Sequence, residues 1–318
     1  MKIVFLDASP AALGLDFKRF EKIGDFTAFD QTPYELAAER MAGCEVVIIN
    51  KVKMDKALID SNPSLRLICE AATGTNNIDL AYAESKGIRV MNVAGYSTDC
   101  VVQTTFTHML NLVFGGSSFD DSVKDGSYTS GGVFCHLGRQ FDELAALKLG
   151  IVGMGAIGQK VARVAEAFGM KVAYFSTSGT AHCKDYPALP LEDLLSGCDI
   201  ISIHAPLNSR TDGLIGKAEL EMMKPSAFLL NMGRGGIVDE AALAEAVDSG
   251  TIAGAALDVF TAEPLPAGHP FMTMRRKDKM IFSPHVAWAG NQTRRRLLDM
   301  VADNIETFLK ESWPDYSA

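Results

Sequence analysis

The sequence lacks long apolar runs, an excess of positive charge and segments of low complexity. No uninterrupted apolar stretch approaches the roughly 18 residues that a membrane-spanning helix needs. The start does not resemble a signal peptide, because only Ile3–Leu6 is apolar before Asp7. The 30 basic and 39 acidic residues leave a net charge of −9, which argues against nucleic acid or an anionic membrane as the main partner. We therefore expect neither nucleic-acid binding nor a membrane protein.

Paired cysteines are also absent, since the six cysteines are widely scattered and form no C-x-x-C motif. Isolated cysteines in apolar surroundings are typical of reduced, buried thiols in a cytoplasmic protein. They predict neither a disulfide framework nor a metal site, and they favour a cytoplasmic location. The six positions are Cys44, Cys69, Cys100, Cys135, Cys183 and Cys198.

Short apolar runs that alternate with helical stretches dominate what is present. The length of 318 residues predicts about two domains. The clearest helix start lies at residues 32–35, where Thr32 can cap the helix and Glu35 can complete a capping box. Regular alternation of strand and helix predicts parallel sheets covered by helices on both faces. The strands expected in the first third are Ile3–Leu6, Val46–Ile49, Leu67–Cys69 and Arg89–Met91.

A second series of strands begins near Lys148, and six strands match a complete dinucleotide-binding sheet. A long helix is expected between the two series, over residues 99–114, followed by a polar, glycine-rich segment at 115–138. A last helix, from about 289 to 310, should return to pack on the first domain. The six expected strands are Leu149–Val152, Lys171–Phe175, Asp199–Ile203, Ala227–Leu230, Ala253–Leu257 and Met280–Phe282.

A glycine-rich loop, Gly153-Met154-Gly155-Ala156-Ile157-Gly158, follows the first strand of this second series. A lone G-x-G-x-x-G motif is a weak signal, but between a strand and an amphipathic helix each glycine has a function. Gly153 permits the tight turn, Gly155 lets the backbone approach a pyrophosphate, and Gly158 allows close packing of helix on strand. The helix N-terminus offers free N–H groups to the phosphates. The loop therefore predicts a dinucleotide site rather than a plain turn.

The residues after the next strand, Lys171–Phe175, bear on which dinucleotide binds. An NAD site usually has Asp or Glu there to bind the ribose 2′-hydroxyl. This chain has Ser176-Thr177-Ser178-Gly179, with neither a carboxylate nor an arginine that could hold a 2′-phosphate. The pattern favours NAD(H) and leaves NADP(H) or dual use open.

Three further strands of the series end next to a charged or titratable residue. Arg234 follows Ala227–Leu230, Glu263 follows Ala253–Leu257, and His285 follows Met280–Phe282. Each alone could be an ordinary surface arginine, turn glutamate or core histidine. Because ligands bind at the carboxyl ends of strands in open parallel sheets, the three together predict the chemical centre.

Nearly the whole chain resembles the D-isomer-specific 2-hydroxyacid dehydrogenase family. Its motifs are most similar to those of glycerate dehydrogenases, also called hydroxypyruvate reductases. The resemblance implies two doubly wound, parallel-sheet α/β domains. A Rossmann cofactor domain (99–287) would be inserted into a flavodoxin-like substrate domain (1–98 and 288–318). The matching motifs are residues 72–79 (Ala-Thr-Gly-Thr-Asn-Asn-Ile-Asp), 92–97 (Asn-Val-Ala-Gly-Tyr-Ser), the glycine loop, 231–239, 258–264 and 283–287.

The resemblance also implies roles that suit the reduction of a 2-keto acid, which has a carboxylate and a carbonyl. Arg234 would bind the carboxylate and polarise the carbonyl. His285 would donate the proton in reduction and accept it in oxidation, with Glu263 on its other ring nitrogen. The backbone N–H groups of Thr73, Gly74 and Thr75 would hold the carboxylate, with Lys51 as a further candidate contact.

On the cofactor side, the resemblance places one group of residues at the pyrophosphate, one at the adenosine and one at the nicotinamide. No metal is implied. The residues are Gly153, Gly155, Ala156, Ile157 and Gly158 at the pyrophosphate, Ser176, His204, Ala205 and Pro206 at the adenosine half, and Met232, Gly233 and Asp258 at the nicotinamide.

The function expected from the resemblance is hydride transfer between NAD(P)H and a small 2-keto acid, chiefly hydroxypyruvate or glyoxylate, to give a D-2-hydroxy acid. One alternative is the reduction of a bulkier acid such as phenylpyruvate. Another is a non-catalytic, corepressor-like NAD sensor, which the lack of low-complexity tails disfavours. The resemblance further implies a homodimer formed through the cofactor domain, with residues 115–138 as an arm.

Overall fold

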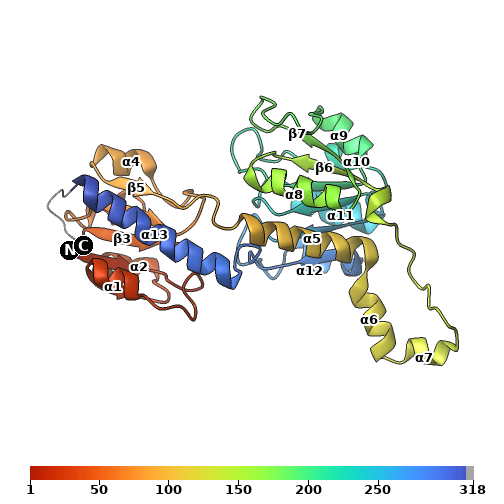
Figure 1. Cartoon of the computed structure of the whole chain (residues 1–318), viewed down its shortest axis with the longest axis horizontal. Helices are drawn as coiled ribbons and strands as arrows, with labels where there is room; N and C mark the ends of the chain where they lie inside the picture. The colour runs from red at the N-terminus through yellow and green to blue at the C-terminus, as the bar shows by residue number, and fades with distance from the viewer. Residues whose placement is uncertain (313–318) are drawn as a thin grey trace. The chain divides into compact units, whose positions relative to one another are not determined.

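The computed structural model describes residues 1–312, which form two compact units. One unit is residues 1–97 together with the segment that begins at Ala289, and the other is Thr98–Trp288. The predicted domain boundaries, at 98 and 288, lie one residue from these. Each unit is a parallel sheet with helices on both faces (Figure 1). No helix among the described residues is long and apolar enough to cross a membrane.

The sheet of the first unit has the strand order β2-β1-β3-β4-β5, and every neighbouring pair is parallel. This order is the flavodoxin-like one. The sequence missed β2, because its D-F-T-A stretch is short, partly polar and exposed at the sheet edge. The strands are β1 (Lys2–Phe5), β2 (Asp25–Ala28), β3 (Val46–Ile49), β4 (Leu67–Glu70) and β5 (Arg89–Met91).

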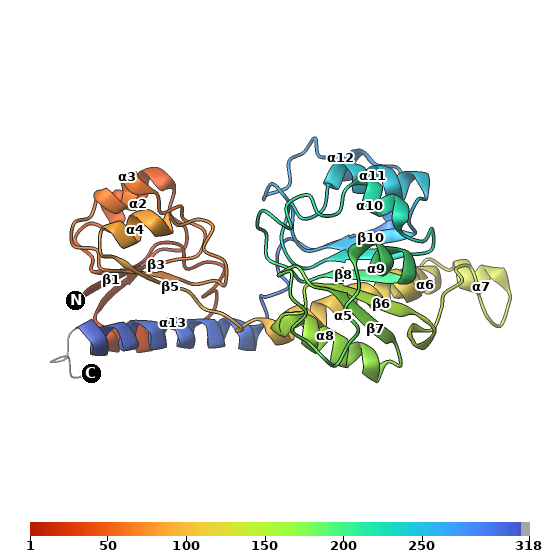
Figure 2. The same cartoon turned by 90° about the horizontal axis from the view of Figure 1, so that it is seen from above.

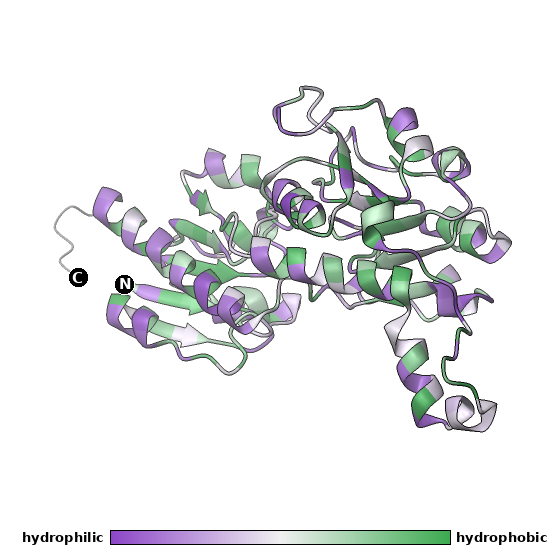
Figure 3. Cartoon of the chain, turned by 45° about the vertical axis from the view of Figure 1, so that its right-hand side comes forward, coloured by the Kyte–Doolittle hydropathy of each residue, from purple (hydrophilic) through white to green (hydrophobic). Residues whose placement is uncertain are grey.

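Helices α2, α3 and α4 cover one face of this sheet, and α13 packs on β4 from the other, as the prediction for the last helix required (Figures 1 and 2). The α13 ribbon alternates between apolar and polar residues (Figure 3), so that its apolar face meets the sheet. The helices of the unit are α1 (Lys18–Ile23), α2 (Tyr34–Arg40), α3 (Lys56–Asp60), α4 (Leu80–Ser85) and α13 (Asn291–Ser312).

The predicted cap of α2 is wrong. The helix begins at Tyr34 with Pro33 at the N-cap position, and no side chain caps it. The hydroxyl of Thr32 instead donates a hydrogen bond to the carbonyl of Leu6, and it accepts one from Arg40 Nη1 at 2.7 Å. Thr32 thus ties the start of α2 to the end of β1, a partner that is far away in sequence.

The sheet of the second unit has the order β11-β10-β9-β8-β6-β7, again all parallel. An isolated bridge between Tyr174 and Ala188 stands where the usual Rossmann order has its third strand. The direction of winding therefore reverses between β6 and β8, where such sheets bind ligands. The strands are β6 (Lys148–Val152), β7 (Lys171–Phe175), β8 (Ile200–Ile203), β9 (Phe228–Asn231), β10 (Gly254–Leu257) and β11 (Met280–Phe282).

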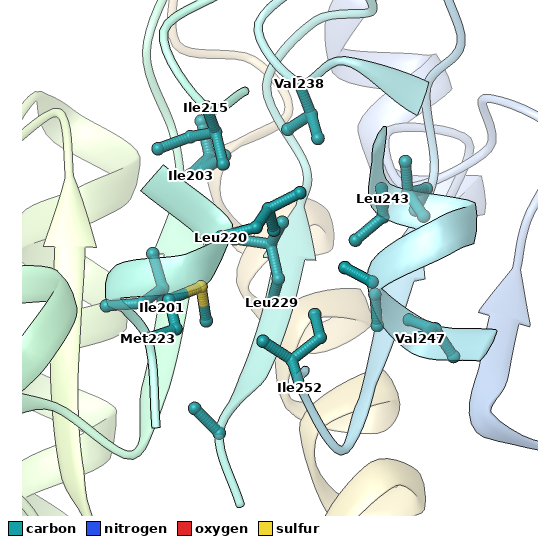
Figure 4. Packing of buried hydrophobic residues seen from close by; sticks show 14 of the residues in the cluster. Ile201, Ile203, Ile215, Leu220, Met223, Leu229, Val238, Leu243, Val247 and Ile252 are labelled. Carbon is teal, nitrogen blue, oxygen red and sulfur yellow. The ribbon is translucent and has the colours of Figure 1, made fainter. Parts of the chain in front are cut away.

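Two apolar cores hold the helices to this sheet. One joins α5 and α8 to the sheet, and the other joins α9, α10, α11 and α12 to the opposite face (Figures 2 and 4). The polar, glycine-rich segment 115–138 contains two short helices, α6 and α7, which bury no residue. The helices are α5 (Thr98–Phe114), α6 (Gly116–Lys124), α7 (Ser127–Gly131), α8 (Ala156–Ala167), α9 (Leu191–Gly197), α10 (Lys217–Met222), α11 (Glu240–Ser249) and α12 (Pro270–Thr273), with 3₁₀ turns at Leu144–Ala146 and Lys277–Lys279.

The cysteines are all free thiols, in agreement with the lack of paired motifs. Burial differs among them. Cys44, Cys69 and Cys198 are buried, as expected, whereas Cys100 and Cys183 are half-buried and Cys135 is exposed in the segment after α7. The expectation of burial was wrong for Cys135 because that segment contributes nothing to either core.

Candidate active site

The glycine loop after β6 has the geometry that its three glycines suggested. Gly153 has φ = +93°, in the left-handed region that favours glycine. A Cβ on Gly158 would lie 2.3 Å from the carbonyl oxygen of Gly153, so only glycine lets α8 pack this closely. A Cβ on Gly155 would meet nothing within 4 Å. The loop is thus open at Gly155, where α8 begins and its N–H groups face outward.

A cavity of about 270 Å³ lies along this loop and takes in both sides of the reversal point. It brings together five residues predicted to bind the cofactor: Gly153, Gly155, Ser176, His204 and Pro206. No aspartate or glutamate lines it. An open glycine cradle beside a cavity free of carboxylates fits the negatively charged half of a dinucleotide. Among the described residues no group of His, Cys, Asp and Glu side chains could hold a metal ion.

His285 and Glu263, predicted as a pair, are in direct contact. His285 Nδ1 lies 2.7 Å from Glu263 Oε2, and both side chains are partly exposed. Glu263 Oε1 accepts a hydrogen bond from the backbone N–H of Phe260 at 2.9 Å, which orients the carboxylate. With Nδ1 engaged, Nε2 is the ring nitrogen left to exchange a proton with a ligand.

The backbone of His285 is strained, because its φ of +53° lies in the left-handed region. Among the described residues it is the one non-glycine with positive φ. Asp258, buried at the end of β10, holds this conformation. Its carboxylate accepts hydrogen bonds from Val286 N at 2.9 Å and Ala287 N at 3.0 Å, and its carbonyl accepts one from His285 N at 2.7 Å. Such strain at a histidine indicates a functional position.

Arg234 lies on a tight turn after β9 that Asn231 organises. Asn231 Oδ1 accepts a hydrogen bond from Gly233 N, and its Nδ2 donates one to the carbonyl of Arg234. The turn presses on the segment after β10, since a Cβ on Gly235 would lie 2.0 Å from the Phe260 carbonyl oxygen. The turns that carry Arg234 and Glu263 are therefore packed together without room for a side chain between them.

Two other histidines in this unit resemble catalytic groups but have structural roles. His269 pairs with Glu240 at 2.8 Å, yet both are largely buried, and Glu240 also holds Thr261 N. This second His–Glu pair fastens α11 and α12 to the segment after β10. His204 is buried against Ser202, and burial lowers its pKa to about 3, so that it stays neutral. A neutral wall fits the assignment of His204 to the cofactor cavity better than a proton donor would.

In the first unit, the predicted substrate loops are held by a buried polar cluster. The carboxylate of Asp7, at the end of β1, accepts hydrogen bonds from the backbone N–H groups of Asn50, Lys51 and Val52. Thr73 is tied to the strand-end segment beyond β5 by a 3.0 Å bond to the Val93 carbonyl. The Lys51 and Thr73 loops therefore have fixed backbones.

The comparisons with known proteins agree with this geometry. Residues 106–287 match the NAD-binding domain of the D-isomer specific 2-hydroxyacid dehydrogenases. A glycerate dehydrogenase of Methylorubrum extorquens is 36% identical over 97% of this chain and 96% of its own length. A hydroxypyruvate reductase of Blautia hydrogenotrophica is 33% identical over 98% of both. The chain belongs to the D-isomer-specific 2-hydroxyacid dehydrogenase family.

Members of this family are oxidoreductases that act on CH–OH groups. The fold agrees, since a solved NADPH-dependent glyoxylate/hydroxypyruvate reductase from Sinorhizobium meliloti, bound to NADP and malonate, superimposes with a TM-score of 0.82. That protein is 26% identical over 97% of this chain and 93% of its own. The family relationship assigns 2-hydroxyacid dehydrogenase activity to this chain.

The structure adds residues that the sequence did not single out. His108 on α5 lies 2.9 Å from the hydroxyl of Ser283, which donates to Asp258 at 2.6 Å, so a chain of hydrogen bonds supports the His285 loop. Arg210 lines the cavity beside the glycine loop and bonds to the Ser178 carbonyl, although no arginine directly follows β7 in the sequence. Neither could be found from spacing, because each partner comes from a distant segment of the chain.

Glu70 is a third such residue, fully buried at the end of β4. Its Oε2 accepts a hydrogen bond from Asn77 Nδ2, which also donates to the Val52 carbonyl, so Glu70 supports both predicted substrate loops. Burial raises the pKa of Glu70 to about 8, with a further contribution from Asp7. Glu70 is therefore protonated in the folded protein at neutral pH.

Replacing Glu70 with glutamine is expected to stabilise the fold progressively more as the pH rises from about 5 to 8. In that range the folded state keeps a proton that the unfolded chain releases near its ordinary pKa of 4.5. Glu70 therefore lowers the free energy of unfolding of the parent by about 1.4 kcal/mol for each pH unit in this range, whereas glutamine makes no such contribution. Thermal unfolding at several pH values measures the difference, with the exposed Glu84→Gln as control. A difference that does not change with pH would contradict the assignment.

Proposed function

We propose that this chain reduces hydroxypyruvate or glyoxylate to the D-2-hydroxy acid, and catalyses the reverse oxidation. The observation that carries the proposal is the 2.7 Å contact between His285 Nδ1 and Glu263 Oε2 on a strained strand-end loop. Relatives that share about a third of its residues over nearly the full length are a glycerate dehydrogenase and a hydroxypyruvate reductase. Both names describe chemistry on the same small 2-keto acid.

In this proposal His285 is the acid and base of the reaction. Glu263 fixes the ring orientation and the tautomer, leaving Nε2 to give a proton to the carbonyl oxygen during reduction and to take it back during oxidation. Positive charge on the imidazole stabilises the oxygen as negative charge develops there. Asp258 keeps the loop in the conformation that presents the ring.

Arg234 is proposed to bind the substrate carboxylate through paired, charge-assisted hydrogen bonds. The backbone N–H groups of Thr73, Gly74 and Thr75 are proposed as further contacts to that carboxylate, together with Lys51. The fixed backbone of both loops supports this assignment, because a preformed set of N–H donors binds an anion without first being ordered.

The residues of the second unit fit a nicotinamide dinucleotide, which supplies or accepts the hydride when bound. The glycine cradle, with Ala156 and Ile157 at the start of α8, is proposed to hold the pyrophosphate. Ser176, His204, Ala205 and Pro206 are proposed to line the adenosine half. Met232, Gly233 and the carboxylate of Asp258 are proposed at the nicotinamide. The sequence favoured NAD(H), but the S. meliloti relative is bound to NADP. In this chain the cation Arg210 contacts the turn after β7, where the two nucleotides are distinguished.

Initial rates with hydroxypyruvate, glyoxylate, pyruvate and phenylpyruvate, each with NADH and NADPH, test the substrate proposal. We expect kcat/KM for hydroxypyruvate or glyoxylate to exceed that for phenylpyruvate by about tenfold or more, which is the discrimination that shape alone supplies. A preference for phenylpyruvate would assign the chain to bulkier acids. Binding of the nucleotides without turnover of any acid would favour the sensor role instead.

A homodimer formed through the cofactor domain is also proposed, with segment 115–138 as its arm. This segment exposes large apolar side chains: Val133 is 51%, Phe134 95% and Leu137 77% exposed. Apolar side chains this exposed are typical of association surfaces. The mass of the protein in solution tests the proposal, and we expect twice the mass of one chain.

A cytoplasmic location stays a prediction.

A further inference from the structure

Arg210 lies against the turn that follows β7, although the two are far apart in sequence. Its Nη1 donates a hydrogen bond to the carbonyl of Ser178 at 2.7 Å. The same atom would lie 3.3 Å from a Cβ placed on Gly179. The guanidinium therefore stands beside the residues that decide cofactor choice in dinucleotide-binding sheets.

A hydrogen-bonded turn after β8 presents Arg210 in this place. The hydroxyl of Thr211, which is fully buried, donates to the Pro206 carbonyl at 2.6 Å and accepts from Asn208 N at 2.9 Å. Asn208 Oδ1 in turn accepts from the backbone N–H of Arg210 at 2.9 Å. The backbone of Arg210 is thus held from both sides, and its position is a property of the turn.

The charge of Arg210 is not balanced by a carboxylate. Within residues 1–312 it forms no ion pair, and no aspartate or glutamate lines the cavity. A guanidinium has five N–H donors, and the Ser178 carbonyl takes one of them. Ser176, Thr177 and Ser178 line the same cavity as Arg210. The hydroxyls of Ser176 and Ser178 already donate to the Thr180 carbonyl, at 2.6 and 3.1 Å.

This combination suits a phosphate. NADP(H) differs from NAD(H) by a phosphate on the adenosine ribose, which carries close to two negative charges near neutral pH and has oxygens that match the forked guanidinium. A carboxylate at the end of β7 would repel that phosphate, but Ser176 stands there instead. We propose that this chain binds NADP(H) and that Arg210, together with Thr177, holds the 2′-phosphate. The inference rests on the proposed dinucleotide site and not on the identity of the keto acid.

Nucleotide binding without keto acid tests this directly. Dissociation constants for NADPH and NADH, measured by fluorescence, are compared for the parent, Arg210→Gln and the control Arg275→Gln, whose side chain is exposed at a distant loop. We expect Arg210→Gln to weaken NADPH about 10- to 100-fold, the usual effect of losing a charged hydrogen-bonding group. NADH should change less than threefold, and the control should change neither.

A second variant provides an independent test in case Arg210→Gln does not fold. Ser176→Asp places a carboxylate at the end of β7 and should abolish the binding of NADPH while NADH still binds. Competition by 2′,5′-ADP against 5′-AMP, which differ in the 2′-phosphate alone, should show the same contrast in the parent protein.

The outcomes separate this inference from the proposed function. If Arg210→Gln weakens NADPH and NADH equally, Arg210 is a clamp on the Ser178 turn and the inference is wrong. If 2′,5′-ADP binds no better than 5′-AMP in the parent, the 2′-phosphate has no site, although the dehydrogenase proposal stands. Failure of every nucleotide to bind would overturn the dinucleotide site and, with it, this inference.

Discussion

His285→Ala is expected to lower kcat at least about 100-fold while the nucleotide still binds. Loss of a positioned acid and base costs roughly 10²–10⁴ in rate, and three other titratable groups of this unit are not free to take over the role. Glu263 is held by Phe260 N, His204 is buried and neutral, and His269 is engaged on both ring nitrogens. Steady-state rates at saturating cofactor and keto acid measure the effect, and fluorescence titration of the reduced nucleotide shows that the fold persists.

Added imidazole provides the control for this prediction. If the missing proton donor is the cause, imidazole in the assay should restore part of the turnover of His285→Ala in proportion to its concentration. Glu263→Gln should keep the imidazole ring in place but hold its orientation less firmly. The fall in kcat should therefore be smaller than that of His285→Ala. Near-normal turnover of His285→Ala would remove His285 from the mechanism.

Arg234→Gln is expected to lower kcat/KM for hydroxypyruvate or glyoxylate by about 100-fold. A charge-assisted, bidentate contact to a carboxylate is among the strongest hydrogen-bonding interactions in proteins, and removing one partner leaves the substrate anion without its countercharge. The turn that carries Arg234 is held by Asn231 and packed against Phe260, so glutamine should leave the backbone in place. The fall in kcat/KM should therefore come from the missing guanidinium group and not from a change in the backbone.

Arg234→Lys separates charge from geometry, because lysine keeps the charge but cannot make the paired contact. Its kcat/KM should fall between those of the parent and Arg234→Gln. The exposed Arg275→Gln serves as the control for loss of a positive charge and should behave as the parent. Equal kcat/KM for Arg234→Gln and the parent would show that the carboxylate is bound elsewhere, with Lys51 or the Thr73 loop as the next candidates.

Much of the fold could be predicted because its causes are local. Val46–Ile49 and Leu149–Val152 are apolar runs of strand length, and residues of this kind form buried parallel strands wherever helices cover both faces. The edge strand β2 was missed because it lacks this local signal. Half of its residues are exposed, and its sequence shows no apolar run. Thr32 was misassigned because its partner, the Leu6 carbonyl, is reached only after β1 and α2 pack.

The contact between Glu263 and His285 was predictable because both residues follow strand ends. Glu263 and His285 follow the neighbouring parallel strands β10 and β11, whose carboxyl ends meet at one edge, so their contact follows from order along the chain. The sequence could not show which histidine–glutamate pair is structural. His269 and Glu240 are about as close together as His285 and Glu263, and the pairs differ in burial, in the left-handed φ of His285 and in the engagement of both ring nitrogens of His269.

The sequence by itself determined the class of fold, the position of the glycine loop and the strand-end positions of Arg234, Glu263 and His285, because periodicity, glycine spacing and strand ends are properties of neighbouring residues. The tertiary structure decided what depends on distant segments meeting. It placed Arg210 beside Ser178, Glu70 beneath two loops, and the chain from His108 through Ser283 to Asp258 behind His285. Side chains from separate elements converge only after the sheet has formed, and no local pattern along the chain records that convergence.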